Sequence, residues 1–111
     1  MSAPGNELLG RIRGLLAGQP GIVERRVVGG TGFMVNGTLA ISATARGDLL
    51  VRVGPAGETA ALALPGAFRM KMGGREMVGY VGVAAADLAD TDDLAAWVQR
   101  GLDHAGALAA K

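Results

Sequence analysis

The pair Asn36-Gly37 constrains the fold of this chain more than any other feature. It stands between two apolar stretches, residues 33–35 and 39–41. A two-residue hairpin turn of the primed type needs a positive φ angle at both positions, which Asn and Gly tolerate better than other residues do. The sequence therefore predicts a tight β-hairpin at Asn36-Gly37, with the rest of the chain covering or extending it.

Antiparallel pairing that counts outward from this turn decides which residues share a face of the hairpin. It pairs Val35 with Thr38, Met34 with Leu39 and Phe33 with Ala40. One face is then expected to carry Met34, Leu39 and Ile41, and the other to carry Phe33, Val35, Thr38, Ala40 and Ser42.

Three segments have the pattern of helices. Residues 6–17 and residues 94–109 repeat apolar residues at helical spacing, and Trp97 is the expected core anchor of the second segment. Asp90 is the expected N-cap of that helix, because its carboxylate can accept hydrogen bonds from the free N–H groups of the first turn. Residues 58–64 are rich in Ala and lie between Gly57 and Pro65, which predicts a short helix.

Strands account for most of the remainder. Residues 22–28, 48–53, 68–72 and 76–83 have strand patterns, and the glycines at 29, 30 and 32 predict a bend or bulge before the central hairpin. In residues 48–53, one face carries Leu49, Val51 and Val53 and the other carries Leu50 and Arg52. Gly73-Gly74 predicts a second hairpin whose turn has two or more residues.

The order of these segments predicts the fold class. Strands that follow one another through short connections favour antiparallel pairing. The expected fold is α+β, with two layers: a largely antiparallel sheet of five or six strands, and helices at the N-terminus, in the middle and at the C-terminus.

Composition sets the broad class of the protein. A chain of 111 residues, half of them hydrophobic, is expected to form one domain over residues 1–111. With 11 basic and 10 acidic residues its net charge is +1, which implies no general attraction to nucleic acid or acidic lipid. It contains no Cys, and no signal or transmembrane segment is recognised, so we expect a cytoplasmic protein without disulfides, without membrane attachment and without a thiolate metal site.

The motifs that resemble ligand sites have simpler explanations. The glycines before Phe33 are followed by a strand and not by the Lys and Ser or Thr of a phosphate-binding loop, so they favour a backbone bend. The carboxylates at 87, 90, 92 and 93 do not follow the spacing of a calcium loop and are typical of helix capping. His104 is the only His and is expected on the solvated side of its helix, and Glu24, Glu58 and Glu76 are expected to be solvated. We therefore predict no catalytic residue, no cofactor and no metal.

Two surfaces remain as candidates for function. The first is an apolar patch on the face of the sheet turned away from the helices; it comprises Phe33, Val35, Ala40, Leu50 and Arg52. Such patches often mark a surface for a partner or for self-association. The second would contact nucleic acid through basic residues of the sheet, but it lacks interleaved aromatic residues; it comprises Arg25, Arg26, Arg69, Lys71 and Arg75. An enzyme or small-molecule binder with an unrecognised site is the third alternative.

Several separated segments resemble one known family in order and spacing. They are residues 24–37 (ERRVVGGTGFMVNG), 50–55 (LVRVGP), 64–67 (LPGA), 74–81 (GREMVGYV) and the closing helix with Leu94 and Trp97-Val98. These marks are similar to those of the TfoX/Sxy family, N-terminal domain, and they cover residues 8–108.

The resemblance has implications for function. Members of this family are associated with regulation of natural competence, where the full-length protein is thought to assist the cyclic-AMP receptor protein at promoters. The resemblance implies an α+β fold, a protein partner, no catalytic residues and no obligate cofactor. We expect a stand-alone member without the C-terminal domain of the full-length regulators, acting as a non-enzymatic protein-interaction domain in transcriptional or competence regulation.

Overall fold

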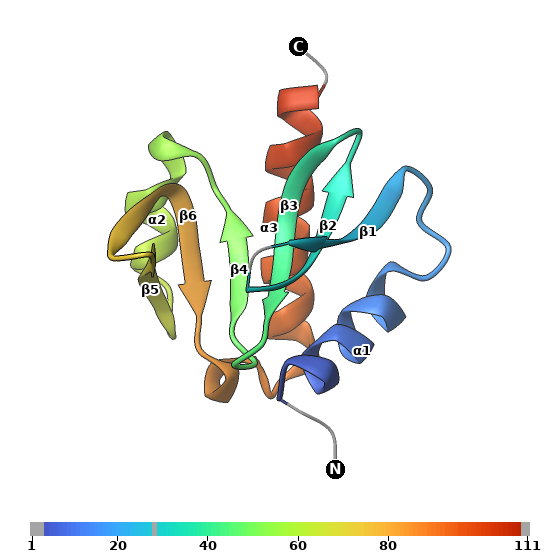
Figure 1. Cartoon of the computed structure of the whole chain (residues 1–111), viewed down its shortest axis with the longest axis horizontal. Coiled ribbons are helices and arrows are strands. Elements are labelled where there is room, and N and C mark those ends of the chain that lie inside the picture. The colour runs from blue at the N-terminus through green and yellow to red at the C-terminus, as the bar shows by residue number, and fades with distance from the viewer. Residues whose placement is uncertain (1–3, 28, 110–111) are drawn as a thin grey trace.

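The computed structural model describes residues 4–27 and 29–109 (Figure 1). The chain runs in this order: α1 (Pro4–Leu16), β1 (Ile22–Val27), β2 (Gly30–Val35), β3 (Thr38–Thr44), β4 (Leu49–Arg52), the 3₁₀ turn η1 (Pro55–Gly57), α2 (Glu58–Leu62), β5 (Ala67–Met72), β6 (Arg75–Val83), the 3₁₀ turn η2 (Ala85–Leu88) and α3 (Thr91–Ala109). Within these described ranges, no helix is long and apolar enough to cross a membrane.

The six strands form one antiparallel sheet in the order β1-β2-β3-β4-β6-β5. Strands that follow one another in sequence pair with each other, except that β4 pairs with β6 and not with β5, which lies at the edge of the sheet. In Figure 1, α3 lies behind β2, β3 and β4, α1 lies beside the β1 side of the sheet, and α2 lies beside β5 and β6. The predicted α+β architecture and element order are confirmed.

The turns show where glycine is required. Asn36 and Gly37 have φ angles of 50° and 84°, which confirms the predicted primed turn. Gly73 and Gly74 have φ angles of 61° and 82° and connect Met72 to its partner Arg75, so that turn has two residues. The predicted bend before the central hairpin is confirmed at Gly29, which lies in the turn between β1 and β2 with a φ angle of 84°. Gly30 and Gly32 lie in β2 instead, and Gly30 pairs with Val27, so β1 and β2 form a hairpin of their own. Val28, the expected end of the first strand, lies outside the described residues.

A β-bulge in β3 changes the predicted faces of the central hairpin. Val35 pairs with Thr38 and Met34 with Leu39, as predicted, but Phe33 pairs with Ile41 and leaves Ala40 as an extra residue. Phe33 and Ile41 therefore share a face, and the prediction that Ile41 lies with Met34 and Leu39 is wrong. The extra residue reverses the alternation for the part of β3 that follows it, because side chains in a strand alternate with a period of two.

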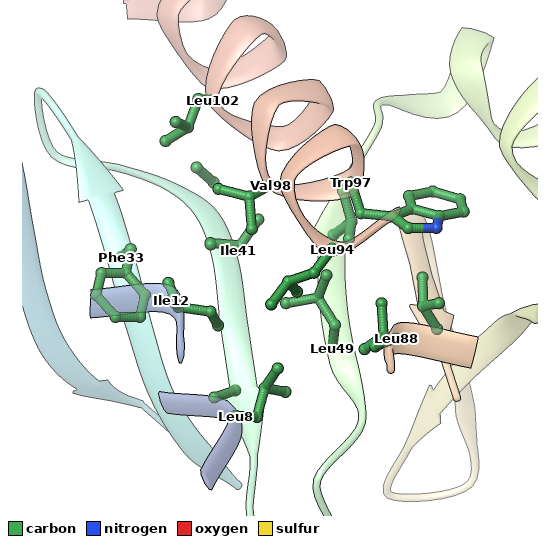
Figure 2. Packing of buried hydrophobic residues seen from close by; sticks show 14 of the residues in the cluster. Leu8, Ile12, Phe33, Ile41, Leu49, Leu88, Leu94, Trp97, Val98 and Leu102 are labelled. Atoms are coloured by element: carbon green, nitrogen blue, oxygen red, sulfur yellow. The ribbon is translucent and has the colours of Figure 1, made fainter. Parts of the chain in front are cut away.

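The core lies between the sheet and the helices. One row of paired residues crosses all six strands, and its four central members are buried: Glu24, Phe33, Ile41, Val51, Val81 and Arg69. Figure 2 shows Phe33 beside Ile12 of α1, and Leu94 and Val98 of α3 turned towards the sheet. Burying side chains of this size contributes about 1.5–3 kcal/mol each.

Helix α3 begins and packs as its sequence indicates. The Oδ1 atom of Asp90 accepts a hydrogen bond of 2.7 Å from the N–H of Asp92, which confirms Asp90 as the N-cap. Trp97 belongs to the core cluster, as predicted. Gly101 faces the bulge, and a Cβ atom placed on it would lie 2.6 Å from the carbonyl oxygen of Ala40. The absence of a side chain at Gly101 therefore allows α3 to approach β3 closely.

Candidate interaction surface

The three helices of the described residues contact the same face of the sheet. Arg13 of α1 forms an ion pair with Glu24, Gly101 of α3 packs against Ile41, and Glu58 of α2 forms an ion pair with Arg69. Glu24, Ile41 and Arg69 all belong to the row described above, whose four central members are buried. The opposite face of the sheet is consequently not covered by a helix.

The next row of paired residues, on that opposite face, also crosses all six strands. In strand order it reads Arg25, Gly32, Ser42, Leu50, Gly82 and Phe68. We call this row, together with Val23, Met34, Leu39, Arg52, Met70 and Tyr80, the open face. Three of the four central positions of the row have small side chains or none. The middle of the open face therefore has space that larger neighbouring side chains can occupy.

Larger side chains lie across the two glycines of the row. A Cβ atom placed on Gly82 would lie 2.5 Å from Cζ of Phe68 and 2.8 Å from Cε of Met70. A Cβ atom placed on Gly32 would lie 2.6 Å from Cδ1 of Leu39. These glycines therefore provide the space in which Phe68, Met70 and Leu39 rest flat on the sheet.

Leu50 is the centre of this second apolar layer. It is only 5% exposed, yet it lies outside the hydrophobic cluster between the sheet and the helices. Its row neighbours Ser42 and Gly82 are also buried. Since no helix covers this face, Leu50 is buried by side chains of the sheet itself.

The margin of the apolar layer carries an arginine stacked on a tyrosine. Arg52 and Tyr80 are paired across β4 and β6, and Cζ of Arg52 lies 5.5 Å from the centre of the Tyr80 ring. On the β1 side, Val23 pairs with Met34 and is 55% exposed. Arg25 and Arg52 are the charges that the pairing of β1 and β4 places on the open face.

The structure divides the five residues that the sequence placed on this surface. Leu50 and Arg52 lie on the open face, as predicted. Phe33 and Ala40 are buried in the core, and Val35 packs against that core from the same side. Their predicted position is wrong because the bulge at Ala40 places Phe33 opposite Ile41, on the helix side.

Sequence reasoning missed five other residues of the open face: Met34, Leu39, Phe68, Met70 and Tyr80. The sequence predicts correctly that Met34 and Leu39 share a face, but it predicts wrongly that this face is turned towards the helices. The pairing of Ser42 with Leu50 identifies it as the open one, and this pairing cannot be counted from the Asn36-Gly37 turn without knowledge of the bulge.

The five basic residues considered for nucleic acid do not form one surface. Arg25 lies on the open face, whereas Arg26 pairs with Thr31 on the helix side of β1. Arg69 is engaged by Glu58 at 3.0 Å and by Glu76 at 3.8 Å. Lys71 and Arg75 are exposed on the β5–β6 hairpin, at the other end of the sheet from Arg25. No continuous basic groove joins them among the described residues.

The glutamates of the sheet and α2 hold elements together. Glu24 accepts two hydrogen bonds from Arg13, of 2.7 and 2.5 Å, and these bonds hold the pKa of Glu24 below its usual value. Oε1 of Glu58 accepts hydrogen bonds from Arg69 and from the N–H of Gly79, both 3.0 Å long. Glu24 is exposed, as expected, and Glu58 is not, since its side chain is only 15% exposed. Both glutamates link a helix to the sheet.

Two other polar features also have structural explanations. His104 is half-buried against Gly54 and is not fully solvated as expected. Gly54 has no side chain, which leaves room for the ring, since a Cβ atom placed on Gly54 would lie 2.4 Å from Cε1 of His104. Among the described residues, no three carboxylate or imidazole groups lie in a position to hold a metal ion.

Comparison with known proteins gives one match. The family model of the TfoX N-terminal domain matches residues 14–105, which is nearly the whole of the 111-residue chain. No curated protein and no solved structure matches. The matched range begins in α1 and ends in α3, so it contains the whole sheet and both rows that cross it.

Proposed function

The chain belongs to the TfoX N-terminal domain family, and we propose that it is a non-enzymatic protein-interaction domain whose partner binds the open face. The observation that carries the proposal is the apolar layer around Leu50. This layer crosses the sheet on the side that no described helix covers. Apolar patches left on the surface of a folded domain often mark partner surfaces.

The chemistry of the open face supports a protein partner. Phe68, Tyr80, Met34 and Arg52 are of the residue types that are enriched in protein interfaces and in their most energetic positions. The side chains resting on Gly32 and Gly82 can shift to fit a partner, because their far ends are held by contacts and not by hydrogen bonds. The charges of Arg25 and Arg52 favour a partner that presents apolar side chains next to carboxylates.

Membership of the family extends this proposal to a regulatory role. We place the chain in transcriptional or competence regulation in the cytoplasm, exerted through contact with another protein. The occupation of Glu24, Glu58 and Arg69 in ion pairs supports a non-enzymatic role, because these side chains serve the fold.

The open face is tested by two charge insertions and a matched control. Met34→Glu and Val23→Glu place a carboxylate on the open face, and Ala60→Glu places one on the exposed side of α2 in the helix layer. Circular dichroism first verifies that all three variants are folded. Sedimentation then measures self-association, and affinity capture from cells of the source organism measures partner binding.

We expect the wild-type chain and Ala60→Glu to bind the same partner, or to self-associate equally, and both open-face variants to lose at least about 90% of the complex, a loss of over 1.4 kcal/mol. If the folded open-face variants retain the complex, the partner binds elsewhere and the proposal is wrong.

Nucleic-acid binding is the competing function, and its candidate contacts are the basic residues Arg25, Arg26, Lys71 and Arg75. Binding through phosphate contacts weakens steeply as salt increases, since counterions are released. We expect no saturable binding of the chain to duplex DNA in fluorescence anisotropy at low salt. Saturable binding with a steep dependence on salt would favour the nucleic-acid function instead.

A further inference from the structure

The two edge strands of the sheet differ in regularity. β5 pairs with β6 through a register shift between Arg69 and Lys71, and a β-bulge of this kind twists an edge and hinders the addition of another strand. β1, at the other end of the sheet in Figure 1, pairs with β2 along its whole length without a shift. β1 therefore presents the regular edge.

The pairing shows which backbone groups of β1 point outward. The N–H of Ala45 donates a hydrogen bond of 2.9 Å to the carbonyl of Gly29, one step beyond the last paired residues of β2 and β3. Successive residues of a strand direct their N–H and C=O groups alternately to its two sides. Since Gly29 is directed to β3, the even-numbered residues of β2 are directed to β1, where their partners are the odd-numbered residues. The even-numbered residues of β1, which are Ile22, Glu24 and Arg26, therefore direct these groups outward.

The outward groups of β1 have no partner within the described residues. No hydrogen bond outside the sheet uses the backbone N–H or C=O of Ile22, Glu24 or Arg26 there. Among the described elements, only β2 packs extensively against β1, and the four central residues of β1 are exposed. The edge is thus a template for the main-chain hydrogen bonds of one more strand.

The charges of β1 indicate which strand fits this edge. Glu24 is paired with Arg13, whereas Arg25 and Arg26 belong to no ion pair among the described residues. Arg25 lies on the open face and Arg26 on the helix side, so the two guanidinium groups flank the edge from both faces. A partner that covers one face reaches only one of them. A strand along the edge reaches both with two consecutive acidic residues, because its side chains alternate between the faces.

The same charges disfavour a second copy of the chain at this edge. Antiparallel pairing of two β1 strands about a twofold axis places one residue opposite itself. Registers centred on the strand put Glu24 opposite Glu24 or Arg25 opposite Arg25, and like charges directly opposite each other are destabilising. The edge therefore favours an acidic strand over its own copy.

We propose that β1 binds an extended acidic segment of a partner protein as an added antiparallel strand. Two consecutive acidic residues of the segment pair with Arg25 and Arg26, and an apolar residue two positions after the second of them lies opposite Val23, which is 55% exposed. The even-numbered residues of β1 exchange main-chain hydrogen bonds with the segment. This contact goes beyond the proposed function, because it uses the backbone at the edge and not the apolar layer around Leu50.

The direction of the backbone groups makes a sharp test possible. The probe is the peptide acetyl-Thr-Glu-Glu-Thr-Val-Thr-amide, whose fourth residue lies opposite Glu24 in this pairing. The N–H of the fourth residue donates to β1, whereas the N–H of the fifth, opposite Val23, is directed away. Methylation of the fourth backbone nitrogen should abolish binding, and methylation of the fifth should leave it nearly unchanged. Titrations followed in ¹H–¹⁵N spectra of the labelled chain at low salt measure the three affinities.

Hydrogen exchange of the chain gives a second readout. With saturating peptide, the amides of Glu24 and Arg26 should exchange several-fold more slowly, because they become hydrogen-bonded. The amides of Val23 and Arg25 are bonded to β2 already and should change little. A peptide that is attracted only by charge would not produce this alternation.

Variants separate the edge from general electrostatic attraction. Arg25→Gln with Arg26→Gln should weaken the peptide about fivefold. Arg75→Gln, exposed on the β5–β6 hairpin, should leave its affinity unchanged. If the double variant is not folded by circular dichroism, each single variant should still weaken binding about twofold. The basic peptide acetyl-Thr-Lys-Lys-Thr-Val-Thr-amide should not bind.

The proposal is overturned by any of these results: no saturable shift of the β1 amides up to about 10 mM peptide, equal binding of the two methylated peptides, or undiminished binding by the folded arginine variants. A dimer of the free chain in sedimentation, with the Glu24 and Arg26 amides already protected, would instead show a second copy at the edge. Met34→Glu of the open-face experiment lies on β2 and outside the edge, so either proposal can fail without the other.

Discussion

Phe33 pairs with Ile41 across β2 and β3, and this pairing turns both side chains towards the helices. Had Phe33 paired with Ala40, Phe33 would lie on the same face as Leu50. The single extra residue at Ala40 thereby separates two apolar layers: the core between the sheet and the helices, and the open face on the other side.

The position of Phe33 in the core predicts a large effect on stability. Phe33→Ala should lower the free energy of unfolding by about 3–5 kcal/mol, because it removes a large buried side chain and leaves a cavity. Val23→Ala, at a side chain that is 55% exposed, should change it by less than about 0.5 kcal/mol. Urea denaturation with a linear extrapolation measures both. A loss below about 1 kcal/mol for Phe33→Ala would contradict its place in the core.

The close contact between α3 and β3 predicts opposite effects of the same substitution at two helical glycines. Gly10 in α1 has no atom within 4 Å of an added Cβ, so Gly10→Ala should stabilise the protein by up to about 1 kcal/mol through helix propensity. In Gly101→Ala, the methyl group would meet the carbonyl oxygen of Ala40 and Cγ2 of Ile41, each at 2.6 Å. We expect a net destabilisation of about 1–3 kcal/mol. Thermal unfolding of both variants measures the signs, and stabilisation by Gly101→Ala would show that the helix does not approach β3 so closely.

The ion pair between Arg13 and Glu24 predicts a dependence of stability on pH. Hydrogen bonds from Arg13 lower the pKa of Glu24 in the folded chain below its usual value of 4.5. The stabilisation is therefore complete above pH 4.5 and is lost as the pH falls through the lower, folded pKa. Wild type should be more stable than Glu24→Gln at pH 7, and the difference should shrink in this acidic range. Denaturant midpoints of both proteins across that range test it, and a difference that grows on acidification would have the wrong sign.

Glu58 and Glu76 both contact Arg69, but they should differ in their contribution to stability. The Glu58 side chain is 15% exposed and also accepts the N–H of Gly79, whereas the Glu76 side chain is 54% exposed and lies 3.8 Å from Arg69. Glu58→Ala should cost about 1–3 kcal/mol, because it leaves the Gly79 N–H without its partner. Glu76→Ala should cost less than about 1 kcal/mol. Equal losses in denaturant unfolding would mean that the bond to Gly79 contributes nothing.

Much of the fold could be predicted because its signals are local. The φ preferences of Asn36 and Gly37 define a turn without any distant contact, and the apolar spacing around Trp97 defines a helix. Asp90 could be identified as an N-cap from the residues that follow it. The candidate site was predicted only in part, since Leu50 and Arg52 were assigned to the uncovered face but Phe33, Val35 and Ala40 were placed there wrongly.

What the sequence determined by itself is the order of elements, the turns and the family, because each rests on neighbouring residues or on marks read in order along the chain. Only the tertiary structure decided which face of the hairpin is buried. Gly101 of α3 packs against the bulge at Ala40, and Arg13 and Glu58 reach the two ends of the row that contains Phe33. These contacts join residues far apart in sequence, and a one-residue bulge reverses the outcome of counting, so no local pattern carries that information.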